Sequence, residues 1–370
     1  MKKLILTVLF IFLLPINSYA LEISAECAYL LLANTGEVLY EKNGKKTHNI
    51  ASTTKIMTAL LAIEKDAINQ ITVVSENAAS QEGSSIYLRR GEEVKINDLL
   101  YGMMLNSGND AACAIAEHIS GDVDTFAVAM TKRAKELGAH NTSFKNPNGL
   151  DAKGHYSTAQ DLAIISAYAL QNDKFCDIVS TKTAEIETSS GTTYLKNHNK
   201  MLWNYEGCIG IKTGYTKSTG RCLVSAARKD GALLIAVTLN APNDWQDHTK
   251  MLDFGFSQIE NKEVLTEGKI LKNFTYNSQN FNAVAKEAVY SILKKGEKQD
   301  IDIFVHTIKS PTVSFKKGEK LGFAEIFVNE KLIKKVDLVS DNDFNFKVKN
   351  DKKQLSECIN KVINFLLLKM

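Results

Sequence analysis

Ser52 and Lys55 are a pair of side chains whose types and spacing suit covalent catalysis. They stand three residues apart on a predicted helix and so share one face, with Ser52 in the first turn, at the positive end of the helix dipole. A serine hydroxyl needs a base to take its proton, and a lysine amine whose charge is suppressed by burial and nearby cations can serve. Alone the pair is a weak signal, because serine is also a common helix cap.

Two further tripeptides carry side chains of catalytic type. Ser107-Gly108-Asn109 lies at a predicted helix–helix junction, which places a hydroxyl and an amide on a loop. Lys212-Thr213-Gly214 ends a predicted strand and is followed by Tyr215. On an edge strand, the glycine would let a substrate backbone approach while the substrate carboxylate meets the lysine and the hydroxyl. Each tripeptide alone also fits an ordinary turn, but ordinary turns explain poorly why the Ser52–Lys55 pair and both tripeptides occur together in this order.

The elements that must position these residues predict an α/β domain over residues 21–258. A β-hairpin is predicted at 27–42, and a nearly buried helix from Ser52. Further helices are predicted at 97–105, 109–119, 123–137 and 249–256, and further strands at 208–213, 222–227 and 233–239. Strands at both ends that enclose central helices describe a sandwich built on an antiparallel sheet.

After residue 258 the sequence changes character, because lysines multiply and short alternating runs replace the helical pattern. Such runs at 282–292, 301–307, 322–328 and 332–338, with turn signals at 316–318 and 328–331, predict a small all-β domain over 259–345. It carries no catalytic constellation, so a spacer or docking role is favoured. Residues 350–370 predict a basic amphipathic helix, which either packs on its own domain or, as we favour, lies on a membrane surface.

Residues 1–20 have the features of a secretory signal peptide. Two lysines precede an apolar run from Leu4 to Leu14, and the small-residue ending at Ala20 suits cleavage. The run is too short for a membrane-spanning helix, which needs about 20 residues. We therefore expect the mature chain to work outside the cytoplasmic membrane.

Composition excludes some other classes of protein. The formal net charge of the 370-residue chain is +3, which gives no basic field for nucleic acid. The six cysteines lack the short paired spacings of a zinc site or a disulfide scaffold, and we expect mostly free, buried thiols. Cys208 would lie opposite a residue near 227 rather than opposite Cys222. The seven histidines form no helix-spaced pair, so neither a metal nor a cofactor is expected.

Together the Ser52-x-x-Lys55 pair and the two tripeptides are the signature of the penicilloyl serine transferases. Over about residues 22–340 the chain resembles the low-molecular-mass penicillin-binding proteins of the D-alanyl-D-alanine carboxypeptidase family. Other segments that resemble this family are 36–43, 146–151, 155–157 and 210–216. The amphipathic helix at 350–370 is similar to the family's membrane anchor.

The resemblance implies a β-lactamase/transpeptidase-like fold and a serine enzyme that removes the terminal D-alanine from peptidoglycan stem peptides ending in D-Ala-D-Ala. It also implies acylation by β-lactam antibiotics. The implied roles are Ser52 as nucleophile, Lys55 as base, Ser107 as proton relay to the departing D-alanine, Lys212 as electrostatic partner, Asn109 as holder of the substrate amide and Thr213 as ligand of the terminal carboxylate. Gly214 and Tyr215 continue the substrate-binding strand, and the N–H groups of Ser52 and Tyr215 would form an oxyanion hole. His198 stands where some members have an arginine near the carboxylate site, which makes it a further substrate-binding candidate.

Three alternatives remain at this point. A class A β-lactamase shares the serine, the lysine and Lys-Thr-Gly, but stretch 145–165 of this chain contains no glutamate for deacylation. A catalytically idle wall-binding scaffold would keep the fold without needing the intact tripeptides. A metallopeptidase is poorly supported, and His155 is better explained as a structural loop residue than as a ligand.

Overall fold

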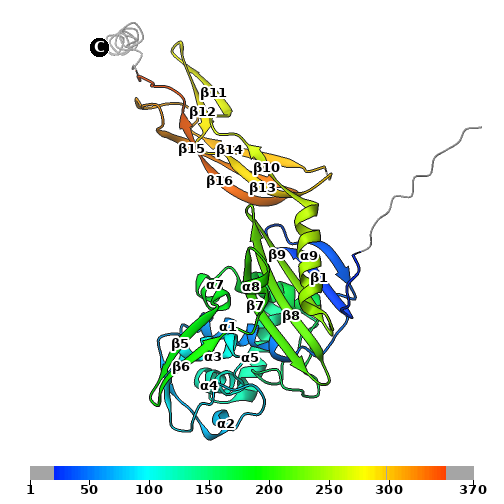
Figure 1. Cartoon of the computed structure of the whole chain (residues 1–370). Coiled ribbons are helices and arrows are strands. Elements are labelled where there is room, and N and C mark those ends of the chain that lie inside the picture. Colours follow the sequence, from blue (N-terminus) through cyan, green and yellow to red (C-terminus); the bar gives the residue numbers. More distant parts are fainter. Residues whose placement is uncertain (1–20, 297, 347–370) are drawn as a thin grey trace, which may run out of the picture. The chain divides into compact units, whose positions relative to one another are not determined.

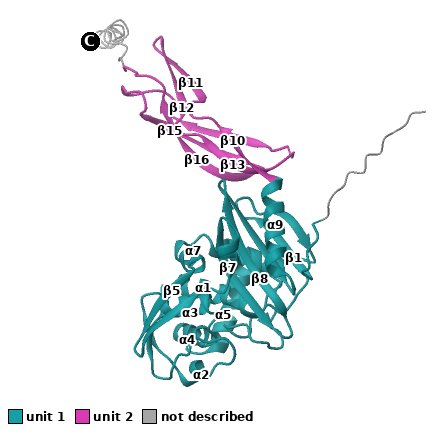
Figure 2. Ribbon diagram, in the orientation of Figure 1, with its two compact units in different colours: residues 1–258 teal, residues 259–370 magenta. Residues whose placement is uncertain are grey.

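The computed structural model describes residues 21–346 except residue 297. The chain divides into two compact units, residues 1–258 and 259–370 (Figure 2). The predicted signal peptide and the predicted helix at 350–370 lie outside the described residues. Within the described part of the chain, no helix has the length and apolar character needed to cross a membrane.

The first unit is built on a five-stranded antiparallel sheet in the order β2-β1-β9-β8-β7 (Figure 1). Its strands are β1 Cys27–Leu32, β2 Glu37–Lys42, β7 Cys208–Thr216, β8 Gly220–Lys229 and β9 Ala232–Leu239. The predicted hairpin and the three later strands are confirmed. Cys208 lies opposite Ala227, as the sequence predicted. Because β7 is an edge strand, one of its sides is open for pairing with an extended peptide.

Helices cover this sheet. Strand β1 is buried at every position, which a strand achieves only when both faces of its sheet are covered. The helix α9 Asp244–Gln258 packs on β8, β9, β1 and β2, and α6 Ala159–Ala169 packs on β1 and β9. The predicted helix at 249–256 is thus the second half of α9, and α6 was not predicted.

The helical part of the unit surrounds one buried helix, α1. The helices are α1 Lys55–Glu64, α2 Glu76–Ala79, α3 Ile96–Leu105, α4 Asn109–Ser120, α5 Val123–Glu136, α7 Asp173–Ser180 and α8 Met201–Asn204. Helices α3 to α7 all contact α1, and its residues 55–63 are buried. The α-helix does not begin at Ser52 as predicted, because a 3₁₀ turn, η1 Ala51–Thr54, precedes it. The Thr53 and Thr54 hydroxyls donate back to the carbonyls three residues earlier, which favours this tighter turn.

A second, four-stranded sheet was missed by the sequence patterns. It has the order β3-β4-β5-β6, with β3 Ile71–Val73, β4 Glu93–Lys95, β5 Thr183–Thr188 and β6 Gly191–Lys196. Strands β5 and β6 each contain a single buried residue, Ile186 and Leu195. Strands this exposed lack the apolar alternation on which prediction depends.

The second unit is all β, as predicted. Strands β11, β12, β16, β15 and β14 form one antiparallel sheet in that order, and β10 pairs with β13. The bounds are β10 Ile259–Leu265, β11 Ile270–Tyr276, β12 Gln279–Ala285, β13 Val289–Lys294, β14 Ile301–Thr307, β15 Lys320–Val328 and β16 Lys331–Ser340. The prediction of one strand at 282–292 was wrong, because the chain leaves the larger sheet after Ala285 and joins the other at Val289. Phe281, Phe315 and Phe344 contact one another in the core of this unit.

Candidate active site

Ser52 and Lys55 lie in direct contact at the start of α1. The Lys55 Nζ donates to Ser52 Oγ at 2.9 Å. Ser52 sits in the η1 turn, directly after Ala51, whose φ of 45° is unusual for a residue with a side chain. The 3₁₀ turn and the first turn of α1 thus bring the hydroxyl and the amine together.

Lys55 is completely buried, yet it makes no ion pair within the described residues. Its Nζ also donates to Asn109 Oδ1 at 2.7 Å and to the Asn148 carbonyl at 2.6 Å. Burial and then the Lys212 ammonium lower the pKa of Lys55 well below 10.5, while Asp110 opposes them. None of its three oxygen partners carries a charge, so no anion holds the proton on the amine. Once neutral, Nζ keeps two N–H donors and has a lone pair that can accept the Ser52 hydroxyl.

The junction between α3 and α4 contains the tripeptide Ser107-Gly108-Asn109. Ser107 is nearly buried and has a φ of 63°, and its hydroxyl has no hydrogen-bond partner among the described residues. Asn109 begins α4 and donates through Nδ2 to the Glu82 carbonyl at 2.5 Å, which leaves its second N–H available. The carboxylate of Asp110 accepts from the backbone N–H groups of Ile86 and Leu88, which fixes loop 84–88 beside the site.

Strand β7 contains the tripeptide Lys212-Thr213-Gly214. Lys212 is buried, and burial lowers its pKa to about 7. Its Nζ donates to the Thr213 carbonyl at 3.1 Å, and within the described residues it has no carboxylate partner. At Gly214 a Cβ would lie 3.1 Å from the Ser52 nitrogen, which is tighter than side chains normally pack. Glycine therefore allows the edge strand to run close to the backbone N–H of Ser52.

The loop at 146–151 forms a further wall that the sequence did not assign. Gly149 has a φ of 87°, and a Cβ there would overlap the Ala51 carbonyl. Its neighbour Asn148 presents a backbone carbonyl to Lys55. The sequence could not predict this contact, because a backbone carbonyl is present at every residue. The Asn-Gly pair at 148–149 predicts only a turn with a left-handed residue.

His155 supports the η1 turn that contains Ser52. Its Nδ1 accepts from the Lys145 N–H at 3.1 Å, so its Nε2 carries the proton and donates to Thr54 Oγ1 at 2.8 Å. The Thr54 hydroxyl in turn donates to the Ala51 carbonyl at 2.8 Å. Burial lowers the pKa of His155 to about 4, so the ring stays neutral near pH 7. The expectation that His155 is structural agrees with these contacts.

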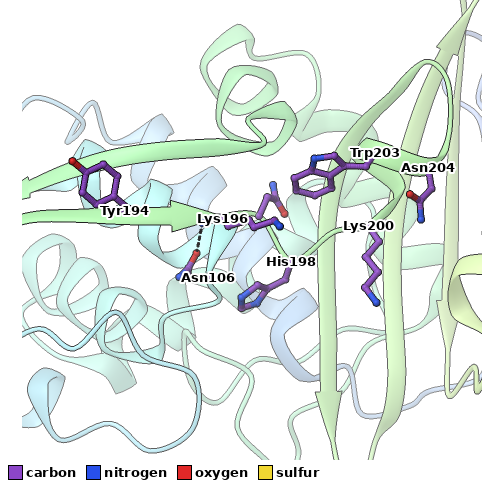
Figure 3. A pocket seen from close by; sticks show the side chains of 8 residues that line it. Asn106, Tyr194, Lys196, His198, Lys200, Trp203 and Asn204 are labelled. Carbon is purple, nitrogen blue, oxygen red and sulfur yellow. Dashed lines mark hydrogen bonds between the residues drawn. The ribbon is translucent and has the colours of Figure 1, made fainter.

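His198 lies next to this group on the segment after β6. Its backbone N–H donates to the Leu105 carbonyl at 3.1 Å. Loss of surrounding water and the nearby Lys212 ammonium lower the pKa of His198. The ring lines a cavity with Asn106, Lys196 and Trp203 (Figure 3). Among the described residues, the side chains of His198, Thr213 and Tyr215 form no hydrogen bond with Ser52 or Lys55.

The arrangement has the groups that acyl transfer needs. Among the described residues it combines the Ser52 hydroxyl, two buried amines without carboxylate partners, and an edge strand. The Lys212 ammonium lowers the affinity of Lys55 for a proton, and it attracts a substrate that carries a carboxylate. Such a site suits a peptide whose terminal carboxylate lies close to the bond that is cleaved.

Comparisons with known proteins agree with this chemistry. Residues 15–243 match the family described as D-alanyl-D-alanine carboxypeptidase, and residues 260–345 match the C-terminal domain of penicillin-binding protein 5. The D-alanyl-D-alanine carboxypeptidase DacF of Bacillus subtilis is 38% identical over 311 residues, which cover 80% of each chain. DacC of Escherichia coli is 31% identical over 362 residues, which cover 89% of this chain and 88% of the relative.

Solved structures agree as well. The D-alanyl-D-alanine carboxypeptidase DacD from Francisella tularensis has a TM-score of 0.62 at 25% identity and covers 88% of this chain and 95% of its own. The Streptomyces K15 DD-transpeptidase has a TM-score of 0.61 at 32% identity and covers 64% of this chain and 98% of its own. This chain therefore belongs to the D-alanyl-D-alanine carboxypeptidase family and is a serine-type carboxypeptidase that acts on peptidoglycan.

Proposed function

We propose that Ser52 is the nucleophile that releases the terminal D-alanine of peptidoglycan stem peptides through an acyl-enzyme. The observation that carries this proposal is the 2.9 Å hydrogen bond between Ser52 Oγ and the buried amine of Lys55. Burial and the Lys212 ammonium hold the pKa of Lys55 low, so the neutral amine is available as a base.

In the first step Ser52 Oγ attacks the carbonyl carbon of the penultimate D-alanine while its proton passes to Lys55 Nζ. The backbone N–H groups of Ser52 and Tyr215 stabilise the oxyanion, a contribution of about 3 kcal/mol for a single donor in comparable sites. The C–N bond then breaks, and Ser107 relays a proton to the departing D-alanine nitrogen. Water hydrolyses the ester in the second step and restores Ser52.

The substrate backbone extends along the edge strand β7. The free N–H of Asn109 Nδ2 holds the substrate amide, and the Thr213 hydroxyl holds the terminal carboxylate beside the Lys212 ammonium. Gly214 leaves room for the reacting carbonyl next to the Ser52 N–H. His198 is the remaining candidate for carboxylate binding, because it lies close enough to Lys212 to be affected by its charge.

Penicillin should form a long-lived adduct rather than turn over rapidly. The partners of Lys55 Nζ are Ser52, an amide oxygen and the Asn148 carbonyl. None of them is a carboxylate that would activate water as in a class A β-lactamase. This supports the carboxypeptidase over the β-lactamase.

Mass spectrometry tests the proposal. Purified enzyme is incubated with penicillin and, separately, with a pentapeptide ending in D-Ala-D-Ala. The unaltered enzyme should gain a stable penicilloyl adduct and release D-alanine, and Ser52→Ala and Lys55→Ala should do neither. An adduct or undiminished D-alanine release in Ser52→Ala would refute the assignment, and rapid loss of the adduct would favour a β-lactamase.

We further propose how the chain reaches its substrate. Residues 1–20 direct secretion, residues 21–258 form the catalytic domain, residues 259–345 act as a spacer or docking domain, and residues 350–370 lie on the outer face of the cytoplasmic membrane. The basic amphipathic sequence of the last segment supports this attachment. Truncation after residue 349 should move the enzyme from the membrane fraction to the soluble fraction without loss of activity toward soluble pentapeptide.

A further inference from the structure

A cavity of about 670 Å³ opens beside the catalytic group, in the first unit. Its lining residues are Asn106, Tyr194, Lys196, Asn197, His198, Lys200, Trp203 and Asn204. Figure 3 shows the side chains of Asn106, Lys196, His198 and Trp203 gathered together, with Tyr194 at one end and Lys200 and Asn204 at the other. Asn106 directly precedes Ser107, and His198 lies near Lys212, so the cavity adjoins the proposed catalytic cleft.

The cavity carries positive charge without a counter-charge. Lys196 and Lys200 line it, and no aspartate or glutamate does. The ammonium groups of Lys196 and Lys182 lie 5.9 and 6.0 Å from the centre of the Trp203 ring. Within the described residues none of these three lysines forms an ion pair. Lys182 and Lys196 thus share the Trp203 ring as a neighbour, and Lys200 lines the same cavity.

The walls of the cavity are formed before any ligand binds. Asn106 Oδ1 accepts from the Lys196 N–H at 3.2 Å, which ties the end of β6 to the Ser107 loop. Asn197 is buried, and its Nδ2 donates to the Thr181 carbonyl at 2.9 Å. A pre-formed wall lowers the entropy cost of binding.

We propose that this cavity binds a non-terminal carboxylate of the stem peptide, with Lys196 and Lys200 as its cationic partners. The inference rests on the proposed function and adds a second contact between the enzyme and the substrate peptide. The terminal carboxylate would meet Lys212, and a carboxylate farther along the same peptide would reach the cavity. Trp203 and Tyr194, which are 42% and 74% exposed, offer apolar faces to the intervening peptide.

The test compares peptides that differ only in carboxylates. The parent pentapeptide contains a γ-linked D-glutamate and a diaminopimelate, each with a free non-terminal carboxylate. Two further peptides carry an amide in place of one of these carboxylates. For the unaltered enzyme, amidation at one position should lower kcat/KM for D-alanine release about fivefold, as expected for a partly exposed charged contact. In the double variant Lys196→Gln/Lys200→Gln this difference should vanish. Equal rates for all peptides with the unaltered enzyme, or a difference that survives in the double variant, would overturn the subsite.

Two controls separate this outcome from other causes. Lys45→Gln/Lys229→Gln removes two exposed lysines elsewhere on the first unit and should keep the full peptide discrimination. Diacetyl-L-Lys-D-Ala-D-Ala has no non-terminal carboxylate, so the cavity variant should process it within about twofold of the unaltered rate. Failure to release D-alanine from any peptide would instead refute the proposed function.

Direct binding gives a readout that does not depend on turnover. The chain has two tryptophans, so Trp245→Phe leaves Trp203 as the single fluorescent reporter. In Ser52→Ala/Trp245→Phe, an acidic stem tripeptide without D-alanine should change Trp203 fluorescence, and its fully amidated form should bind at least about fivefold more weakly. Equal affinities for the two tripeptides would contradict the proposal.

Discussion

The backbone of Gly149 lies directly against that of Ala51, the residue before Ser52. A Cβ at position 149 would overlap the Ala51 carbonyl and lie 3.0 Å from the Ser52 nitrogen. The same loop presents the Asn148 carbonyl to Lys55 at 2.6 Å. The loop at 146–151 thus holds both the left-handed backbone of Ala51 and the amine beside the nucleophile.

Gly149→Ala should therefore lower both stability and acylation. The φ of 87° and the overlap with Ala51 add to an expected loss of about 2–4 kcal/mol in the free energy of unfolding. Gly121→Ala is the matched control, because Gly121 has a φ of 84° with open space around it. It should cost about 1–2 kcal/mol and leave the rate of penicillin acylation unchanged. Urea unfolding and stopped-flow acylation measure the two effects, and equal acylation in both variants would contradict this role.

His155 should position the nucleophile turn through the Nε2 proton that it donates to Thr54. A glutamine amide can take the place of the imidazole Nε2, whereas an asparagine amide is too short. His155→Asn should therefore lower the acylation rate about tenfold, and His155→Gln should retain most of it. Thr54→Val, which removes the hydroxyl between His155 and Ala51, should behave like His155→Asn. Identical rates for the glutamine and asparagine variants would show that this contact does not matter.

The activity should have a bell-shaped dependence on pH. Ser52 attacks only when Lys55 is neutral, so kcat/KM should rise with pH as the free enzyme loses the Lys55 proton. The substrate carboxylate binds better to charged Lys212, whose pKa is lowered to about 7, so kcat/KM should fall above about pH 7. Lys212→Arg keeps its charge at high pH and should remove the alkaline limb. An alkaline limb that persists in this variant would assign it to another group.

Acid should weaken the fold through buried neutral histidines. His248 bridges Ser225 and Thr238, and burial lowers its pKa from 6.5 to about 3. As the pH falls below 6.5, His248 becomes protonated in the unfolded chain but stays neutral in the folded protein. The free energy of unfolding therefore decreases as the pH falls from 6.5 toward 3. The expected loss is about 1–2 kcal/mol between pH 6.5 and about pH 5.

Replacing this ring tests its contribution. His248→Gln does not titrate, so it should flatten the pH dependence of the unfolding free energy, measured by urea denaturation at each pH. His140→Gln alters an exposed histidine and should leave the slope as it was. An unchanged slope in His248→Gln would show that other groups control the acid loss.

Local sequence patterns determined much of this protein. The Ser52–Lys55 pair and the two tripeptides follow from residue types at short spacing. The hairpin at 27–42, the helices between residues 96 and 136 and the strands after residue 207 follow from short-range apolar spacing and turn residues. Strands β5 and β6 were missed because their residues are mostly exposed. The run at 282–292 was predicted as one strand because the change of sheet after Ala285 has no signal in the local sequence. Periodicity reports which side of an element is buried, and a strand with a single buried residue gives too weak a pattern to detect.

Only the tertiary structure decided how the catalytic group is supported. Lys55 meets the carbonyl of Asn148, 93 residues away, and Thr54 meets His155, 101 residues away. The low pKa values of Lys55 and Lys212 arise mainly from burial. Lys196 is held at the cavity by the hydrogen bond between its backbone N–H and Asn106. Residue type and spacing in the sequence were enough to name the proposed nucleophile and base, since both lie within one turn. Contacts between distant segments and the removal of water exist only once the chain has folded, and these set the charge on Lys55 and the shape of the site.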